Sequence, residues 1–179
     1  MSCGKRREDC ICDVVSDIID AQDDVVEKHC DTSCETSIQE LVSPSTANGG
    51  NTTVPFILYC ENCKPFIASG VVQTPRGGSG GFAYECVETP VLKAKHFVEG
   101  SDCCVKVELL LPVNNGGNQP KPSDKNISDV CRFFPGRSIA NFEATGICII
   151  IDLNCFCGIT CLPAITPVSP SASNHDKED

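Results

Sequence analysis

Cysteine content is the feature that most constrains this chain, because 15 of its 179 residues are cysteine. Cysteine at this density is typical of secreted domains that disulfides hold together, but such domains are usually short. A chain of this length can bury a hydrophobic core without such cross-links. We therefore expect the thiols to serve something besides the stability of the fold, and the hypothesis that we favour is covalent joining of many copies.

The charge balance limits the partners of the chain. It has 24 acidic and 14 basic residues, a net charge of −10, and its basic residues are scattered. An acidic surface repels phosphate, so we expect no nucleic-acid partner and no binding to anionic membranes.

The longest apolar stretch, residues 147–159, is interrupted by polar residues and is shorter than the roughly 20 residues that a membrane span needs. The first residues are charged and have no apolar run, which predicts synthesis in the cytoplasm without a secretory signal.

The N-terminal part carries the clearest helical signal. After a flexible arm at residues 1–9, we expect an amphipathic helix over residues 10–29, and its flanking cysteines extend this segment to residue 34. Apolar residues recur there at helical spacing: Ile11, Val14, Val15, Ile18, Val25 and Val26. The opposite face is acidic: Asp13, Asp17, Asp20, Asp24 and Glu27. That face is either solvated or docks on a basic surface of a neighbouring copy.

From about residue 52 the pattern becomes typical of strands. Short β-like runs alternate with Gly, Pro and Asn. The predicted strands cover residues 54–60, 67–73, 82–87, 91–98, 105–111 and 147–161. Many short strands with turns between them predict a mainly β fold, a sandwich or jelly-roll-like core over residues 52–165, with the one N-terminal amphipathic helix. Residues 74–81 and 112–129 are expected to be surface loops, and residues 166–179 a disordered tail.

Metal binding and thiol redox chemistry are the main alternatives to cross-linking. Cys60 and Cys63 have the CxxC spacing of a zinc site, but such a site needs a second pair, and the other local pairs are spaced by zero, one or three residues. A redox CxxC lies at a helix N-terminus, whereas this one follows a strand-like run and precedes Lys64 and Pro65. We therefore expect no metal, no other cofactor and no catalysis.

Disulfide pairing cannot be complete within one chain, because the number of cysteines is odd. Cys155 and Cys157, two apart on a predicted strand, would point to the same face and could not easily bond to each other. The adjacent Cys103 and Cys104 would point to opposite faces of a strand. Burial as a small apolar side chain suits Cys148, Cys155 and Cys157, since their neighbours are Ile, Leu and Phe.

The cysteines then divide into two groups by their position relative to the predicted helix. Those at or beside the helix are candidates for intermolecular disulfides: Cys3, Cys10, Cys12, Cys30 and Cys34. The others are candidates for intrachain disulfides or buried thiols: Cys60, Cys63, Cys86, Cys103, Cys104, Cys131, Cys148, Cys155, Cys157 and Cys161.

Four stretches of the sequence resemble one family. Residues 147–162 read ICIIIDLNCFCGITCL, close to the pattern C-I-x-V-D-L-x-C-F-C-x-I-x-C-L of the spore coat and exosporium proteins CotY, CotZ and ExsY. The opening MSCGK, the CICD step at residues 10–13 and VPFILY at residues 54–59 are similar to the same family. The resemblance covers roughly residues 1–165. Residues 75–81, residues 112–129 and the tail depart from the pattern, so the contacts that these loops make in a lattice stay open.

The resemblance implies a structural protein of the outer layers of spores of Bacillus-like bacteria. Such proteins form hexameric rings that tile into two-dimensional sheets reinforced by disulfides, so the implied partners are other copies and other coat or exosporium proteins. The chain would be made in the reducing mother cell and oxidised once layered on the spore. We expect assembly to precede oxidation. A secreted disulfide-rich binding module is disfavoured by the missing signal and the odd cysteine count.

Overall fold

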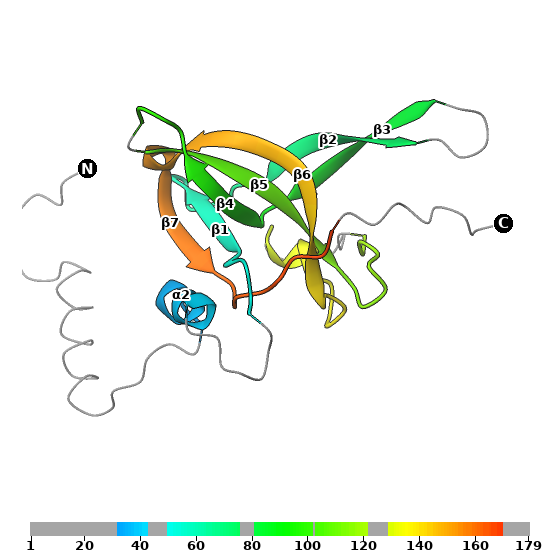
Figure 1. Cartoon of the computed structure of the whole chain (residues 1–179), viewed down its shortest axis with the longest axis horizontal. Coiled ribbons are helices and arrows are strands. Elements are labelled where there is room, and N and C mark those ends of the chain that lie inside the picture. The colour runs from blue at the N-terminus through cyan, green and yellow to red at the C-terminus, as the bar shows by residue number, and fades with distance from the viewer. Residues whose placement is uncertain (1–31, 43–49, 76–80, 102, 122–128, 170–179) are drawn as a thin grey trace, which may run out of the picture. The chain divides into compact units, whose positions relative to one another are not determined.

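Antiparallel strands in two sheets make up most of the computed structural model, which describes residues 32–42, 50–75, 81–101, 103–121 and 129–169 (Figure 1). The elements are α2 (Cys34–Val42), β1 (Phe56–Cys60), β2 (Ala68–Pro75), β3 (Phe82–Thr89), β4 (Leu92–Phe97), β5 (Cys104–Val113), the 3-10 helix η1 (Cys131–Phe133), β6 (Asn141–Asp152), the 3-10 helix η2 (Leu153–Cys155) and β7 (Phe156–Cys161). The larger sheet has the order β6-β5-β4-β1-β7, and β2 pairs with β3 in a two-stranded ribbon.

The expectation of a mainly β fold with one helix near the N-terminal region is confirmed for the described residues. The helix that the structure describes is α2, which begins at Cys34. The amphipathic helix expected over residues 10–29 lies outside the described residues, as do Cys3, Cys10, Cys12 and Cys30.

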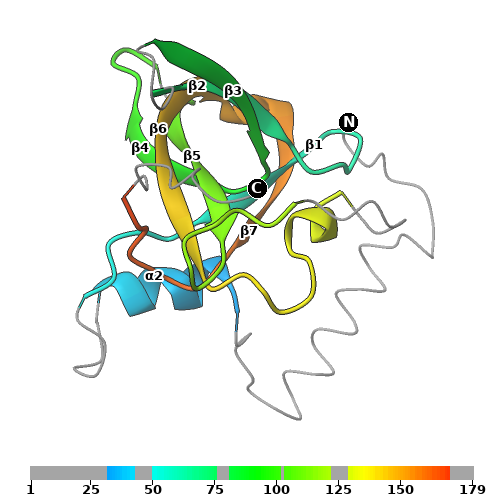
Figure 2. The same ribbon diagram turned by 90° about the vertical axis from the view of Figure 1, so that its right-hand side faces the viewer.

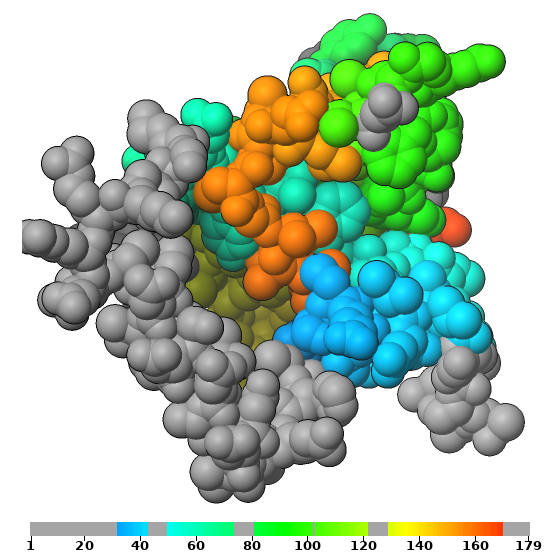
Figure 3. Space-filling model, turned by 90° about the vertical axis from the view of Figure 1, so that its left-hand side faces the viewer, coloured from blue at the N-terminus to red at the C-terminus, as the bar shows by residue number. Residues whose placement is uncertain are grey.

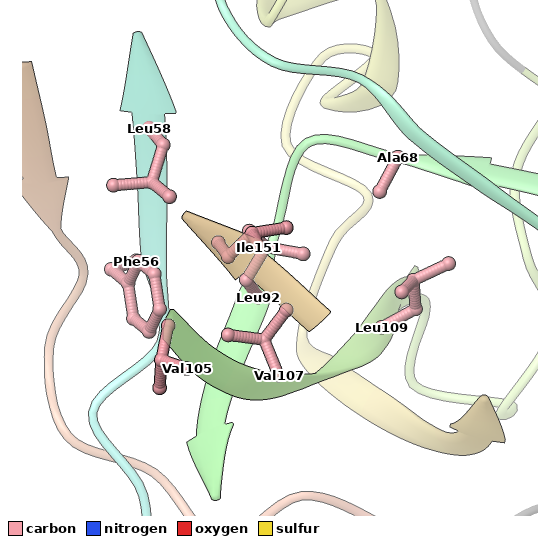
Figure 4. Close-up of a cluster of buried hydrophobic side chains, with 8 residues drawn as sticks. All are labelled: Phe56, Leu58, Ala68, Leu92, Val105, Val107, Leu109 and Ile151. Carbon is pink, nitrogen blue, oxygen red and sulfur yellow. The ribbon is translucent and has the colours of Figure 1, made fainter. Parts of the chain in front are cut away.

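The core lies on both faces of the larger sheet, because successive side chains along a strand point to opposite faces. Phe56 and Leu58 of β1 belong to one buried cluster, while Ile57 between them belongs to another. Figure 4 shows the buried residues of the first cluster: Phe56, Leu58, Ala68, Leu92, Val105, Val107, Leu109 and Ile151. Ala68 comes from the ribbon, so the strands of both sheets curve around one shared interior (Figure 2).

Glu108 of β5 is buried beside a bulge in β6. The sequence pattern, by contrast, places Glu108 opposite the apolar face of β5. Glu108 pairs with Cys148 but Leu110 already pairs with Ala144, so β6 has extra residues there. Gly146 at the bulge has φ +74° and donates its N–H to the Glu108 carboxylate over 3.0 Å. The other carboxylate oxygen accepts from Lys95 Nζ at 3.1 Å. The buried charge is thereby paired.

Gly70 of β2 lets the ribbon approach the larger sheet closely. A Cβ at this position would lie 2.8 Å from Ile147 Cγ2 and 3.6 Å from Leu109 Cδ2. Both of those side chains pack in the first cluster, so they have little room to move. The absence of a side chain at residue 70 therefore sets the distance between β2 and the β5–β6 pair.

We expect Gly70→Ala to lower the free energy of unfolding by about 1–3 kcal/mol, because the added methyl group overpacks the contact with Ile147. Urea unfolding followed by circular dichroism measures the change. Gly50→Ala is the matched control, since no heavy atom lies within 4 Å of its added Cβ. Equal stability of the two variants would contradict the close packing of the ribbon.

The expectation of one strand over residues 147–161 is wrong, because β6 ends at Asp152 and β7 begins at Phe156. Between them, the Asp152 carboxylate accepts a hydrogen bond from the Asn154 N–H at 2.9 Å and caps η2. Cys155 therefore lies in η2 and Cys157 in β7, so the two do not share one strand face. Cys103 likewise precedes β5, which begins at Cys104.

Candidate functional site: the cysteine residues

A disulfide joins Cys34 at the start of α2 to Cys161 at the end of β7. The two Cα atoms are 4.7 Å apart, and the residues are separated by 127 positions in sequence. Figure 3 shows α2 in blue against the orange end of β7. Ser33 caps the helix, since its Oγ accepts the Thr36 N–H at 3.1 Å.

A hydrogen bond also joins α2 to the segment that follows β7. Near its C-terminal end, Glu40 Oε2 accepts the N–H of Ala164 at 3.2 Å. Ser37 is the buried residue of the helix. Ile38 and Val42, by contrast, are exposed. The disulfide is therefore a principal attachment of this short helix to the sheet.

The structure differs here from the sequence-based expectation, which placed Cys34 among the intermolecular candidates. The expectation rested on the position of Cys34 beside a surface helix. Docking of α2 on β7 brings the Cys34 sulfur to Cys161 of the same chain. Sequence spacing could not predict this pair, because a separation of 127 residues carries no information on spatial distance.

Cys60, Cys63 and Cys157 gather at one end of the β1–β7 pair. The CxxC segment forms a tight turn, in which Cys63 N–H donates to the Cys60 carbonyl at 2.9 Å and Cys63 has φ +61°. The Cys157 thiol donates to the same carbonyl at 2.9 Å. Across the described part of the chain, no three or more His, Cys, Asp or Glu side chains form a group that could hold a metal ion.

Most of the described cysteines outside the disulfide are on the surface. The exposed ones are Cys63, Cys86, Cys131, Cys148, Cys155 and Cys157, and the half-buried ones are Cys60, Cys103 and Cys104. This differs from the burial expected for Cys148, Cys155 and Cys157. Alternation along β6 explains Cys148, because Ile147 and Ile149 pack against the core and the residue between them points outward.

Cys103 and Cys104 lie where β5 begins, beside the end of β6. Cys104 pairs with Asp152, and its N–H donates to Ser101 Oγ at 2.9 Å. The carbonyl of Cys103 accepts the N–H of Leu153 at 3.0 Å.

Among the described helices, none is long and apolar enough to cross a membrane.

Comparison with known proteins assigns the family of the chain. Residues 1–164 match the sequence model of the family described as "Spore coat protein Z". The chain is also 30% identical over 158 residues to "Spore coat protein Z" of Bacillus subtilis (strain 168), an alignment that covers 88% of this chain and 91% of the relative. No solved structure matches. The resemblance read from the cysteine-rich C-terminal run is confirmed, and the chain belongs to the spore coat protein Z family.

Proposed function

We propose that copies of this spore coat protein assemble into hexameric rings, that the rings tile into two-dimensional sheets, and that intermolecular disulfides then lock the sheets. Membership of the coat protein family supports a structural role in the spore coat. The chain would be made in the mother cell and deposited in the coat or the exosporium together with other proteins of these layers. The role requires no cofactor and no catalysis.

The observation that carries the proposal is the placement of the exposed cysteines on separate elements. Cys63 lies in the turn after β1, Cys86 on β3, Cys148 on β6, Cys155 in η2 and Cys157 on β7. In the sheets, Cys86 lies opposite Val71 and Cys148 lies opposite Glu108, so neither faces another cysteine. A disulfide needs Cα atoms within about 4.4–6.8 Å. Cys86 and Cys148, which have no cysteine opposite them in the sheets, are the ones best suited to partners on other copies.

The order of events follows from the redox compartment. A reducing mother cell keeps exposed thiols reduced, and the net charge of −10 keeps the chain soluble at high concentration. Non-covalent contacts would therefore build the lattice, and later oxidation would convert an equilibrium assembly into a covalent one.

Negative-stain electron microscopy and a non-reducing gel test this order. We expect rings or sheets both in reduced samples and after oxidation, with a ladder of covalent multimers only after oxidation.

A variant with serine in place of five exposed cysteines should weaken the ladder while the rings persist. The five are Cys63, Cys86, Cys148, Cys155 and Cys157. Cys60→Ser, at a half-buried position, is the control that should keep the ladder. Loss of rings on reduction would contradict assembly before oxidation, and a uniform monomer without a ladder would contradict the proposed function.

A further inference from the structure

Strand β7 is an outer strand of the larger sheet, with β1 as its sole strand neighbour among the described residues. In an antiparallel pair, alternate residues turn their N–H and C=O toward the partner strand. The N–H of Leu162 donates to Pro55 at 2.8 Å, so the even-numbered residues Thr160 and Leu162 face β1. Ile159 and Cys161 therefore turn their backbone groups to the open edge.

The opposite side of the pair agrees with this assignment. Ile159 is paired with Leu58, and the Leu58 carbonyl accepts the N–H of Phe66 on the far side of β1 at 2.8 Å. Leu58 thus does not bond to Ile159. Within the described residues, no backbone hydrogen bond satisfies the outward N–H and C=O of Ile159.

The composition of β7 leaves this edge unprotected. Natural edge strands usually carry a lysine, another charge, a proline or a bulge that prevents pairing with other chains. The sequence of β7, FCGITC, has no charged residue and no proline. Its bulge, where Cys157 is an extra residue opposite β1, lies before Ile159, and Ile159 is 54% exposed. A chain with net charge −10 nevertheless presents an uncharged strand at its edge, where two copies could meet without charge repulsion.

The other outer strand, β6, is a poorer partner. Val168 already covers its first half, since Ala144 N–H donates to the Val168 carbonyl and Val168 N–H donates to the Phe142 carbonyl, each at 2.9 Å. The bulge at Gly146 interrupts the next part of β6. The better match for an open β7 is therefore a second β7.

We propose that β7 docks antiparallel against β7 of a second copy about a two-fold axis, with Ile159 opposite Ile159 and their outward N–H and C=O groups bonded to each other. The contact is isologous, and the uncharged sequence suits it, because a two-fold axis places each residue near its own copy. This inference rests on the proposed self-assembly and assigns one of its non-covalent contacts.

Hydrogen exchange resolved to single amides tests the contact directly. The full chain is handled without oxygen and without reductant, so that the Cys34–Cys161 bond stays intact, and is compared at low and high protein concentration. We expect the amides of Ile159 and Cys161 to exchange at least about tenfold more slowly in the assembled sample. The amides of Thr160 and Leu162 should be protected at both concentrations, because they bond to β1.

Two results would overturn the proposal. Protection of the Ile159 amide in the monomer would mean that another segment of the same chain covers the edge. Rapid exchange of this amide in assembled protein would mean that the copies meet elsewhere.

Variants separate this contact from self-assembly in general. Ile159→Lys places two like charges opposite each other and should weaken association about tenfold or more, as measured by sedimentation velocity. Val71→Lys is the control, since Val71 is 60% exposed on β2 and lies opposite Cys86, which is not a lysine or arginine. Ile159→Pro removes the outward N–H but no bond to β1, and should also weaken association. If Ile159→Lys associates like the wild type, the β7 contact is wrong while self-assembly stands; if the wild type does not associate, both are wrong.

Discussion

Replacement of both Cys34 and Cys161 by serine is expected to lower the free energy of unfolding by up to roughly 5 kcal/mol, because this bond closes a very long loop in the unfolded chain. The two residues are 127 positions apart, and the loss of unfolded-state entropy grows with loop length. Urea unfolding of the oxidised protein, followed by circular dichroism, measures the difference from the wild type.

The same variant should release α2 from the sheet. A helix of nine residues is too short to be stable alone in water, and without the disulfide α2 would depend on weaker contacts such as that of Glu40 with Ala164. Limited proteolysis within α2 should therefore become faster than in the wild type. Cys63→Ser, which removes an exposed thiol outside the disulfide, is the control and should change neither stability nor proteolysis. A double variant as stable as this control would contradict the intrachain bond.

Glu108→Ala is expected to lower the free energy of unfolding by about 2–4 kcal/mol, because it removes a buried carboxylate that accepts two charge-assisted hydrogen bonds, one from the Gly146 N–H and one from Lys95. Glu108 is 6% exposed and is the one charged residue among the buried residues described. Lys95 is partly exposed, so water compensates for part of its loss and the effect stays below that of a fully buried ion pair. Thermal or urea unfolding of the variant measures the change.

Glu88→Ala is the matched control for this prediction. Its carboxylate lies 3.6 Å from Arg132 in an exposed ion pair, and such pairs contribute about 0–1 kcal/mol. Glu108→Gln, which keeps an oxygen acceptor for Gly146, should fall between the two. If Glu108→Ala costs no more than Glu88→Ala, the carboxylate does not stabilise the bulge in β6.

The Cys34–Cys161 bond differs from the disulfides that we propose between copies. The Cys34–Cys161 bond uses two cysteines within the chain, whereas Cys63, Cys86 and Cys148 remain exposed on other elements. In our proposal both kinds of bond form on oxidation after assembly, so the Cys34–Cys161 bond would then stabilise each subunit within a lattice that non-covalent contacts had already built.

Local patterns in the sequence were sufficient to predict several strands. Residues 54–60 and 91–98 were expected as strands, and β1 and β4 lie within them. Alternating apolar residues, bounded by Pro and Gly, reflect the two-residue period of a strand, which depends on near neighbours only. The family also followed from local sequence, because the cysteines of residues 147–162 keep fixed spacings.

Apolar composition alone misplaced the boundary between β6 and β7. Ile, Leu, Phe and Cys surround Asp152 and Asn154 on both sides, so a single long strand was expected. A side-chain hydrogen bond from Asn154 N–H to Asp152 ends β6 there. The side chain that makes this cap is visible in the sequence, but whether it caps a turn or points to solvent depends on the surrounding packing.

What the sequence by itself determined is the β class of the fold, the position of most strands and the family, since each depends on residues close together in the chain. Only the tertiary structure decided that β7 lies beside β1 at an edge, that Glu108 is buried and that Cys34 bonds to Cys161. Each of these depends on contacts between segments far apart in sequence. Such contacts form because many side chains pack at once, and no local pattern records which distant segments will meet.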